Sequence, residues 1–258
     1  TGSDLNSTQV TEKLEMLGAK CYKGHSALNI INPDLVVVST AIPSDNPELL
    51  VAQKKGIPVI HRGDVLAMLM GLQRGIAVCG AHGKTTITSM IASVLEKNQL
   101  DPTIVIGGEL TEIGGNAKLG RGEYLVAEAD ESDGSFLKLY PEVSVITNIE
   151  DDHMDYYGDM SEIIVAFEKF LDQTSGVAVV CLDDVNVRQI ISSYNKPLIT
   201  YGIDSIEADY TVGKIKYDST GINGDIYFRG EYLGMLKLSV PGRHNLLNAL
   251  AAVAVARM

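Results

Sequence analysis

Short apolar runs rich in valine and isoleucine alternate with helical patterns along most of the chain. The runs carry no regular polar alternation, which is expected of strands that helices cover on both faces. Strands that alternate with helices form a mostly parallel sheet, so the sequence predicts an α/β fold. The predicted strands are 34–40, 57–60, 75–80, 103–108, 124–130, 143–149 and 176–184, and the predicted helices are 8–17, 46–55, 63–72, 84–97, 161–172, 184–193 and 244–257.

Residues 205–240 follow a different pattern. Apolar and polar residues alternate there, and Asn-Gly, Asp and Gly provide turn signals. This pattern predicts an antiparallel β meander attached to the parallel sheet. A domain boundary is expected at 70–75, where one helix ends and a new strand begins. We therefore predict a Rossmann-like domain over 1–73 and a P-loop-type domain over 74–258.

The two ends of the chain do not look like domain ends. The opening "TGSDL" is typical of the end of a strand, whereas a Rossmann-like unit opens with a strand and a glycine-rich loop. The final "VAVARM" stops within an apolar helix that has no C-terminal cap signal. We expect the natural protein to extend beyond both ends and the Rossmann-like domain to be incomplete here.

Composition excludes several classes of protein. A formal charge of −12 repels phosphate backbones, so we expect no nucleic-acid partner. Cys21, Cys79 and Cys181 form no C-x-x-C pair, which favours a reducing compartment over disulfides or a zinc site. No apolar stretch is long enough to span a bilayer, and no signal-peptide pattern is present. These features predict a soluble, cytoplasmic protein.

Residues 79–90, "CGAHGKTTITSM", contain the end of a phosphate-loop pattern. The full pattern asks for a glycine at position 78, where this chain has valine. A β-branched strand precedes the loop and a helix follows it, which is the context that a phosphate loop requires. Backbone N–H groups and the helix N-terminus attract phosphate, Lys84 can reach a β- or γ-phosphate, and a threonine hydroxyl can bind Mg²⁺. The alternative is an ordinary turn with a solvated lysine.

Two acid-rich segments follow predicted strands. "VAEADESDGSF" places Glu128 within a strand end, where a carboxylate needs a partner and can serve as an Mg²⁺ ligand. "TNIEDDHMDYYG" places His153 beside four acids, and we predict that His153 holds a second cation. A solvated acidic loop and a structural histidine are the alternatives.

The segment "VPGRHNLLNALAAVAVA" begins the last predicted helix. His244 or Asn245 is expected to cap this helix. Asn245 and Asn248 are three residues apart and share a helical face, where their amides can hydrogen-bond a nucleobase. Capping and an incidental polar residue are the alternative.

Together, "GAHGKTT", "EADESDGSF", "TNIEDDHMDYYG" and "VPGRHNLLNALAA" closely resemble the ATP-dependent Mur ligase family, and "EADESDGSF" is particularly similar to its alanine-adding member. "GSDL", "STAIPSDNPEL" and "GIPVIHRGDVLAMLM" resemble the family's N-terminal domain. The family's usual loop, G-T-H-G-K-T, also lacks the early glycine, so Val78 is no departure. Ala81 in place of threonine and Asp151 in place of a small residue are departures.

The resemblance implies roles for particular residues. ATP phosphates would lie against Gly80, Ala81, His82, Gly83, Lys84, Thr85 and Thr86, and adenine against His244, Asn245 and Asn248. Mg²⁺ would be held by Thr85, Glu128 and His153, and the UDP-sugar by residues near Asp4, Ser39 and His61. Lys84, Glu128 and His153 would be the catalytic residues.

The implied reaction has two steps. The lactyl carboxylate of UDP-N-acetylmuramate attacks the γ-phosphate of ATP, and the amine of L-alanine then displaces phosphate from the acyl phosphate. Such a role in cell-wall precursor synthesis implies a bacterium. A sister ligase that adds a preformed peptide or another amino acid, and a nucleotide-binding module without ligase activity, remain alternatives. The family's C-terminal amino-acid-binding domain has no counterpart here, so we expect this chain alone not to complete the reaction.

Overall fold

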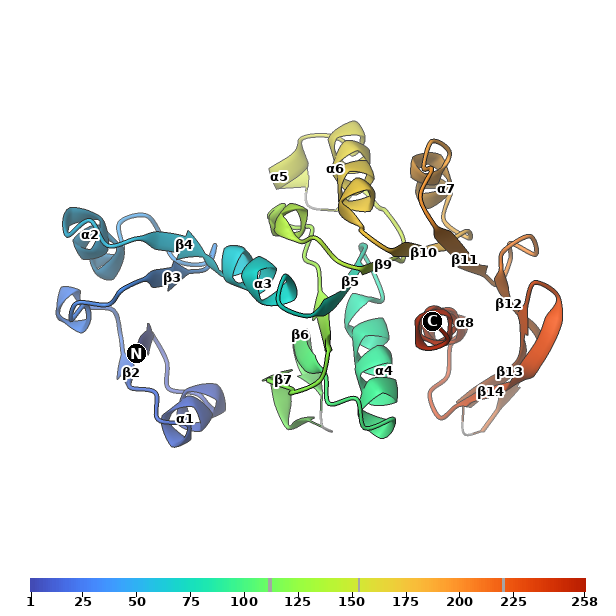
Figure 1. Cartoon of the computed structure of the whole chain (residues 1–258), viewed down its shortest axis with the longest axis horizontal. Coiled ribbons are helices and arrows are strands. Elements are labelled where there is room, and N and C mark those ends of the chain that lie inside the picture. Colours follow the sequence, from blue (N-terminus) through green and yellow to red (C-terminus); the bar gives the residue numbers. More distant parts are fainter. Residues whose placement is uncertain (111–112, 153, 220) are drawn as a thin grey trace. The chain divides into compact units, whose positions relative to one another are not determined.

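The computed structural model describes residues 1–110, 113–152, 154–219 and 221–258 (Figure 1). Within these residues the chain forms two compact units, Thr1–Leu66 and Ala67–Met258. Helices and strands interleave as the sequence predicts, and the fold is α/β. None of the described helices has the length and apolar character needed to cross a bilayer.

The first unit contains two separate pairs of parallel strands. β1 (Gly2–Asp4) pairs with β2 (Cys21–Lys23), and β3 (Val36–Val38) pairs with β4 (Val59–His61). The predicted strand end in "TGSDL" is therefore confirmed as β1, whereas the three-residue β2 was too short to show a pattern. The helical segments that begin in this unit are α1 (Gln9–Met16), η1 (Ala27–Asn29), α2 (Pro47–Lys54) and α3 (Arg62–Met70).

Local sequence explains where α2 begins. Asn46 caps the helix, because its Oδ1 accepts hydrogen bonds from the N–H groups of Glu48 (2.9 Å) and Leu49 (3.4 Å). Pro47 occupies the first turn, as predicted, where its missing N–H leaves no hydrogen bond unmade.

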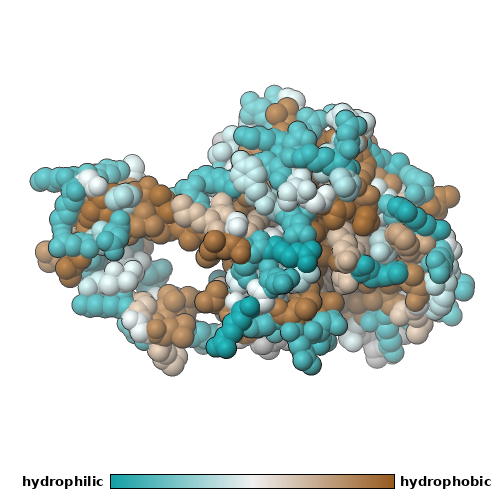
Figure 2. Space-filling model, viewed as in Figure 1, coloured by the Kyte–Doolittle hydropathy of each residue, from teal (hydrophilic) through white to brown (hydrophobic). Residues whose placement is uncertain are grey.

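The first unit has a thin core. Within residues 1–66, all of which the structure describes, Ala52 is the one buried apolar side chain. Figure 2 shows brown patches on the visible face of this unit. Leu35, Val37 and Leu50 of this unit are 42–50% exposed. Four short strands in two pairs offer too little surface to bury more.

The second unit is built on a sheet whose described strands lie in the order β14-β13-β12-β11-β10-β9-β5-β8-β6-β7. In this order, all strands from β12 across the sheet to β6 run parallel to one another. β7, at the edge beyond β6, is antiparallel to β6. The bounds are β5 (Arg74–Cys79), β6 (Thr103–Leu110), β7 (Gly115–Lys118), β8 (Tyr124–Glu128), β9 (Val143–Ile146), β10 (Val177–Cys181), β11 (Leu198–Gly202), β12 (Tyr210–Asp218), β13 (Gly221–Phe228) and β14 (Glu231–Leu238).

Helices pack against this sheet through apolar residues at helical spacing. In α4, Ile87, Ile91 and Leu95 recur every four residues, and all three are buried. α8 packs against α4, and its alanines allow the close approach, since Ala251 and Ala254 are fully buried. The described helical segments of this unit are α4 (Lys84–Lys97), η3 (Ser135–Lys138), α5 (Met154–Tyr157), α6 (Met160–Gln173), α7 (Val185–Ile191) and α8 (Arg243–Ala256).

The antiparallel meander is confirmed as β12, β13 and β14. The prediction that Asn-Gly forms a turn in it is wrong. Asn223 and Gly224 lie inside β13, where a Cβ on Gly224 would stand 2.5 Å from the Val212 side chain. The glycine thus serves close strand packing. The turn between β13 and β14 uses Arg229 and Gly230, both with positive φ (49° and 82°), as a two-residue hairpin requires.

Candidate nucleotide-binding site

The phosphate-loop segment connects β5 to α4, as predicted, and two of its glycines are required by geometry. Gly80 has φ 127°, and a Cβ there would stand 2.1 Å from Thr147 Oγ1. Gly83 has φ 88°, and a Cβ there would stand 2.6 Å from Asn248 Oδ1. Only glycine adopts these angles without strain and leaves room for the neighbouring side chains.

The residues after β9 hold the loop in place. Thr147 Oγ1 donates to the His82 carbonyl (2.7 Å), and Asn148 Oδ1 accepts from the His82 N–H (2.8 Å). The Asn148 carbonyl accepts from the Ala81 N–H (3.1 Å). The N–H groups of Ala81 and His82 are therefore engaged within the protein, and helix geometry leaves the first-turn N–H groups of α4 to face a ligand.

Lys84 lies at the start of α4 and is largely buried, with 17% of its side chain exposed. Its Nζ donates to the Gly80 carbonyl (2.6 Å) and to Glu131 Oε1 (2.7 Å), and it lies 3.4 Å from the Ala81 carbonyl. Glu131 is only 6% exposed. Lys84 is thus not a solvated surface lysine, and the pairing with Glu131 was not predicted from the sequence.

Glu128 is the last residue of β8, as the sequence placed it. Its Oε1 is buried and has no hydrogen-bond partner within the described part of the chain. A buried carboxylate oxygen left in this way fits a hard cation such as Mg²⁺. Beside it, Gly107 and Gly108 of β6 leave space: Cβ atoms there would stand 2.9 Å from Glu128 Oε2 and 3.0 Å from Thr85 Cγ2. Both predicted metal ligands that the structure describes therefore lie against these two glycines.

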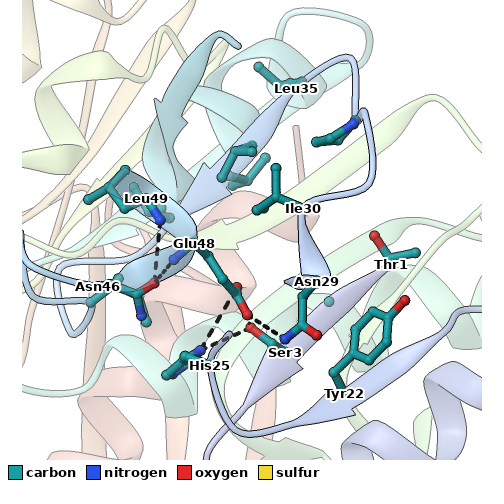
Figure 3. Close-up of a pocket in the computed structure, with 16 residues that line it drawn as sticks. Thr1, Ser3, Tyr22, His25, Asn29, Ile30, Leu35, Asn46, Glu48 and Leu49 are labelled. Carbon is teal, nitrogen blue, oxygen red and sulfur yellow. Dashed lines mark hydrogen bonds and ion pairs between the residues drawn. The ribbon is translucent and has the colours of Figure 1, made fainter. Parts of the chain in front are cut away.

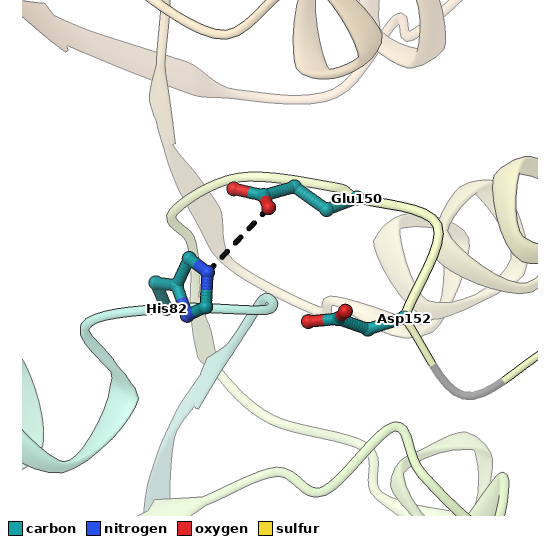
Figure 4. A group of neighbouring side chains, drawn as sticks. All are labelled: His82, Glu150 and Asp152. Carbon is teal, nitrogen blue, oxygen red and sulfur yellow. Dashed lines mark ion pairs between the residues drawn. The ribbon is translucent and has the colours of Figure 1, made fainter.

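His153, the third predicted metal ligand, lies outside the described residues. Close to the loop, His82, Glu150 and Asp152 form an exposed cluster (Figure 4). His82 Nε2 lies 3.5 Å from Glu150 Oε2, and ligand atoms of all three side chains lie within 4.8 Å of one another. The ion pair in this cluster forms only when His82 is protonated.

A cavity of about 490 Å³ opens beside the loop. α8 contributes His244 and Asn248, two of the predicted adenine-binding residues, to its wall, and β10 and β11 contribute Cys181 and Tyr201. The lining residues are His82, Gly83, Thr147, Asn148, Cys181, Asp183, Asp184, Tyr201, His244, Leu247 and Asn248. This wall combines apolar surface with amide, carboxylate and imidazole groups, which suits a nucleoside.

The predicted cap of the last helix is wrong. α8 begins at Arg243 after Gly242, which has φ 107° and provides no side-chain cap. Asn245 is the third residue of the helix, where its Nδ2 donates back to the Pro241 carbonyl (2.7 Å). This side chain is not among those that line the cavity, so of the two asparagines only Asn248 reaches it.

Burial makes two of the three cysteines unreactive. Desolvation raises the pKa of Cys181 to about 12 and that of Cys79 well above its usual value, so both remain neutral thiols. We expect iodoacetamide at mildly alkaline pH to label Cys21, which is partly exposed, and to leave the other two intact until the protein is denatured. Peptide mass spectrometry measures this, and rapid labelling of Cys181 in the native protein would contradict the buried site.

The predicted sugar-binding residues lie at or just after the carboxyl ends of strands in the first unit. Asp4 ends β1, and its Oδ1 accepts from the Asn6 N–H (2.9 Å). Ser39 follows β3, and His61 ends β4, where its N–H donates to Asp64 Oδ2 (2.8 Å). None of the three belongs to the lining of the 290 Å³ cavity of this unit.

That cavity is organised by Glu48 (Figure 3). Glu48 accepts hydrogen bonds from Ser3 Oγ (2.6 Å), Asn29 Nδ2 (2.6 Å) and the Ser26 N–H (3.1 Å), and His25 Nδ1 lies 2.9 Å from Ser3 Oγ. Partial burial opposes ionisation, but these hydrogen bonds outweigh it and lower the pKa of Glu48. The segment "SDNPEL" contains Glu48, yet nothing local in it marks this residue as the centre of a cluster.

Comparison with known proteins places these features in a family. The sequence profile of the Mur ligase middle domain matches residues 78–256, and that of the Mur ligase family catalytic domain matches residues 1–74. The UDP-N-acetylmuramate--L-alanine ligases of Pelotomaculum thermopropionicum and Desulforamulus reducens are 62% and 56% identical to the whole of this chain. The chain spans about half the length of these relatives, 56% in both cases.

Solved structures show the same fold. The UDP-N-acetylmuramate-alanine ligase of Thermotoga maritima matches 98% of this chain, and 58% of its own length, with a TM-score of 0.87 and 32% identity. A UDP-N-acetylmuramate:L-alanyl-gamma-D-glutamyl-meso-diaminopimelate ligase from Neisseria meningitides matches 99% of this chain, and 84% of its own length, with a TM-score of 0.88 and 26% identity. With profile matches that cover most of its length and a phosphate loop built as described above, the chain belongs to the Mur ligase family.

Proposed function

We propose that the whole protein is the ATP-dependent ligase that joins L-alanine to the lactyl carboxylate of UDP-N-acetylmuramate, with release of ADP and phosphate. The observation that carries this proposal is the 62% identity, over the full chain, to a relative with that name. Three features support it: the glycine-containing loop between β5 and α4, the buried Glu128 Oε1 that has no hydrogen-bond partner among the described residues, and the polar and apolar cavity beside the loop. They suit phosphate, a cation and a nucleoside in turn.

We assign roles in this reaction to the chain's own residues. Lys84 and the first-turn N–H groups of α4 bind the β- and γ-phosphates, and the cavity walls at His244 and Asn248 bind the adenosine end of ATP. Thr85 and Glu128, with His153, hold Mg²⁺. The metal, when bound, supplies positive charge that offsets the repulsion between the γ-phosphate and the substrate carboxylate.

We also propose which part of the chain binds which substrate. We assign the UDP-sugar to 1–73, through Asp4, Ser39 and His61, and ATP to 74–258. The compact units divide seven residues earlier than this boundary, between Leu66 and Ala67. We further propose that the protein works in the bacterial cytoplasm without a nucleic-acid partner, as its −12 charge favours.

A sister activity, the addition of a preformed peptide to UDP-N-acetylmuramate, is the second candidate. The Neisseria structure favours it, since its TM-score of 0.88 is as high as the 0.87 of the alanine ligase from Thermotoga. Sequence favours the alanine ligase, because the peptide ligase is only 26% identical to this chain.

Phosphate release by the full-length protein tests both candidates. With ATP, Mg²⁺ and UDP-N-acetylmuramate, we expect release that depends on L-alanine and is much slower with glycine, L-serine or a tripeptide. A preference for the tripeptide would select the sister activity. If no amino acid or peptide stimulates release, the ligase proposal is wrong.

A further inference from the structure

The exposed cluster of His82, Glu150 and Asp152 brings two carboxylates together (Figure 4). An oxygen of each carboxylate and a nitrogen of the imidazole all lie within 4.8 Å of one another. Within the described residues, no lysine or arginine pairs with Glu150 or Asp152. Two carboxylates at this separation repel each other, and a protonated His82 offsets only one of the two charges. The cluster therefore has the charge that a divalent cation would balance.

The imidazole decides which divalent cation fits. Mg²⁺ and Ca²⁺ take oxygen ligands, whereas Zn²⁺ binds imidazole nitrogen and carboxylate oxygen in the same site. Two ligand atoms of a tetrahedral Zn²⁺, each bound at about 2.0–2.1 Å, lie about 3.4 Å apart. His82 Nε2 and Glu150 Oε2 are 3.5 Å apart, so this pair already has the separation that zinc requires. Asp152 is exposed and can turn to complete the set.

The segment after β9 fixes the main chain at His82. Asn148 Oδ1 accepts from the His82 N–H (2.8 Å), and Thr147 Oγ1 donates to the His82 carbonyl (2.7 Å). Asn148 Nδ2 also donates to Glu150 Oε1 (3.4 Å), which leaves Oε2 of that carboxylate facing the imidazole. Partners of this kind orient metal ligands and raise metal affinity. The ligands are thus brought together before any ion binds.

From this geometry we propose that His82, Glu150 and Asp152 bind a transition-metal ion of the Zn²⁺ class, with water at the remaining coordination position. The site uses none of the residues assigned above to Mg²⁺. It does not depend on the proposed function, since it requires neither ATP nor the ligase reaction. His82 belongs to the phosphate loop and the two carboxylates to the segment after β9, so a bound ion joins these two parts of the chain.

Titration calorimetry of this chain with Zn²⁺, in excess Mg²⁺ to fill the oxygen-rich sites, tests the proposal. For the wild type we expect one Zn²⁺ to bind per chain. For His82→Ala and for Glu150→Gln we expect binding to weaken at least about tenfold, because even an indirect partner of a metal ligand contributes about 10-fold to 100-fold in affinity. The two side chains are 68% and 45% exposed, so both variants are expected to fold.

His25→Ala is the matched control. His25 Nδ1 lies 3.9 Å from a Glu48 oxygen, so it also places an imidazole beside a carboxylate, but these two belong to no group of three metal-binding side chains among the described residues. This variant is expected to bind Zn²⁺ as the wild type does. His153→Ala is a second control, because it removes the histidine next to Asp152 in sequence, and it is also expected to retain Zn²⁺.

The proposal is wrong if the wild-type chain binds no Zn²⁺ in excess Mg²⁺. It is equally wrong if His82→Ala binds Zn²⁺ as tightly as the wild type, and loss of the ion in His153→Ala would then identify that histidine as the ligand. A chain that binds Zn²⁺ as expected but binds no ADP in Mg²⁺ would support this site and contradict the proposed nucleotide site.

Discussion

A Lys84→Ala variant of the full-length protein is expected to release phosphate from ATP about 100-fold to 1,000-fold more slowly than the wild type. Lys84 lies where the loop meets α4, and its ammonium contacts the Gly80 carbonyl of the loop. Removing one preorganised donor to a charge that develops in the transition state lowers the rate by about 100-fold to 1,000-fold. Phosphate release in the presence of both proposed substrates measures the effect. Near-wild-type turnover would show that the loop does not bind the transferring phosphate.

The single variant is also expected to affect stability, because it breaks the ion pair between Lys84 and the largely buried Glu131. We expect the free energy of unfolding to fall by about 3 kcal/mol, since the carboxylate is 6% exposed. Lys84→Ala/Glu131→Gln removes both charges and is expected to regain much of this stability while remaining as slow as the single variant. Lys118→Ala is a suitable control, because its ammonium pairs with Glu96 and Asp101 away from the loop.

A Gly80→Ala variant is expected to lose about 3 kcal/mol of stability together with nucleotide binding. Two effects add: the φ of 127° is unfavourable for alanine, and the new Cβ would stand 2.1 Å from Thr147 Oγ1 and 2.8 Å from the Asn148 carbonyl. The backbone carbonyl cannot move aside as a flexible side chain can. Chemical denaturation and ADP titration of this chain measure both losses.

A Gly230→Ala variant separates the effect of backbone strain from that of a steric clash. Gly230 also has a positive φ, 82°, but a Cβ there meets nothing within 4 Å. We expect it to cost about 1 kcal/mol and to leave ADP binding unchanged. Equal effects of the two substitutions would mean that Thr147 and Asn148 do not hold the loop as described.

Periodicity was sufficient to locate most of the helices and strands. The spacing of Ile87, Ile91 and Leu95 defines the buried face of α4, and the predicted helices end within two residues of the observed ones. Predictions that depended on a single residue type were less secure. Asn223-Gly224 looked like a turn and lies inside a strand, and Asn245 looked like a cap and lies within the helix.

The site shows a similar division. Strand ends are visible in sequence, so Glu128 could be placed at the end of β8. The contacts that give the loop its shape join residues more than 60 positions apart, as between His82 and Asn148. No local pattern specifies such a pair, because which strand ends meet depends on the order of strands in the sheet.

The sequence by itself determined the α/β class, the strand–loop–helix context of Lys84 and the resemblance to a ligase family, since propensity, periodicity and motif order are properties of neighbouring residues. Only the tertiary structure decided that Thr147 and Asn148 hold the loop. It also decided that Asn248 rather than Asn245 reaches the cavity, and that Lys84 forms an ion pair with Glu131. Those are consequences of packing: β9 lies beside β5 and α8 lies against α4, and only then do side chains distant in sequence come within hydrogen-bonding distance.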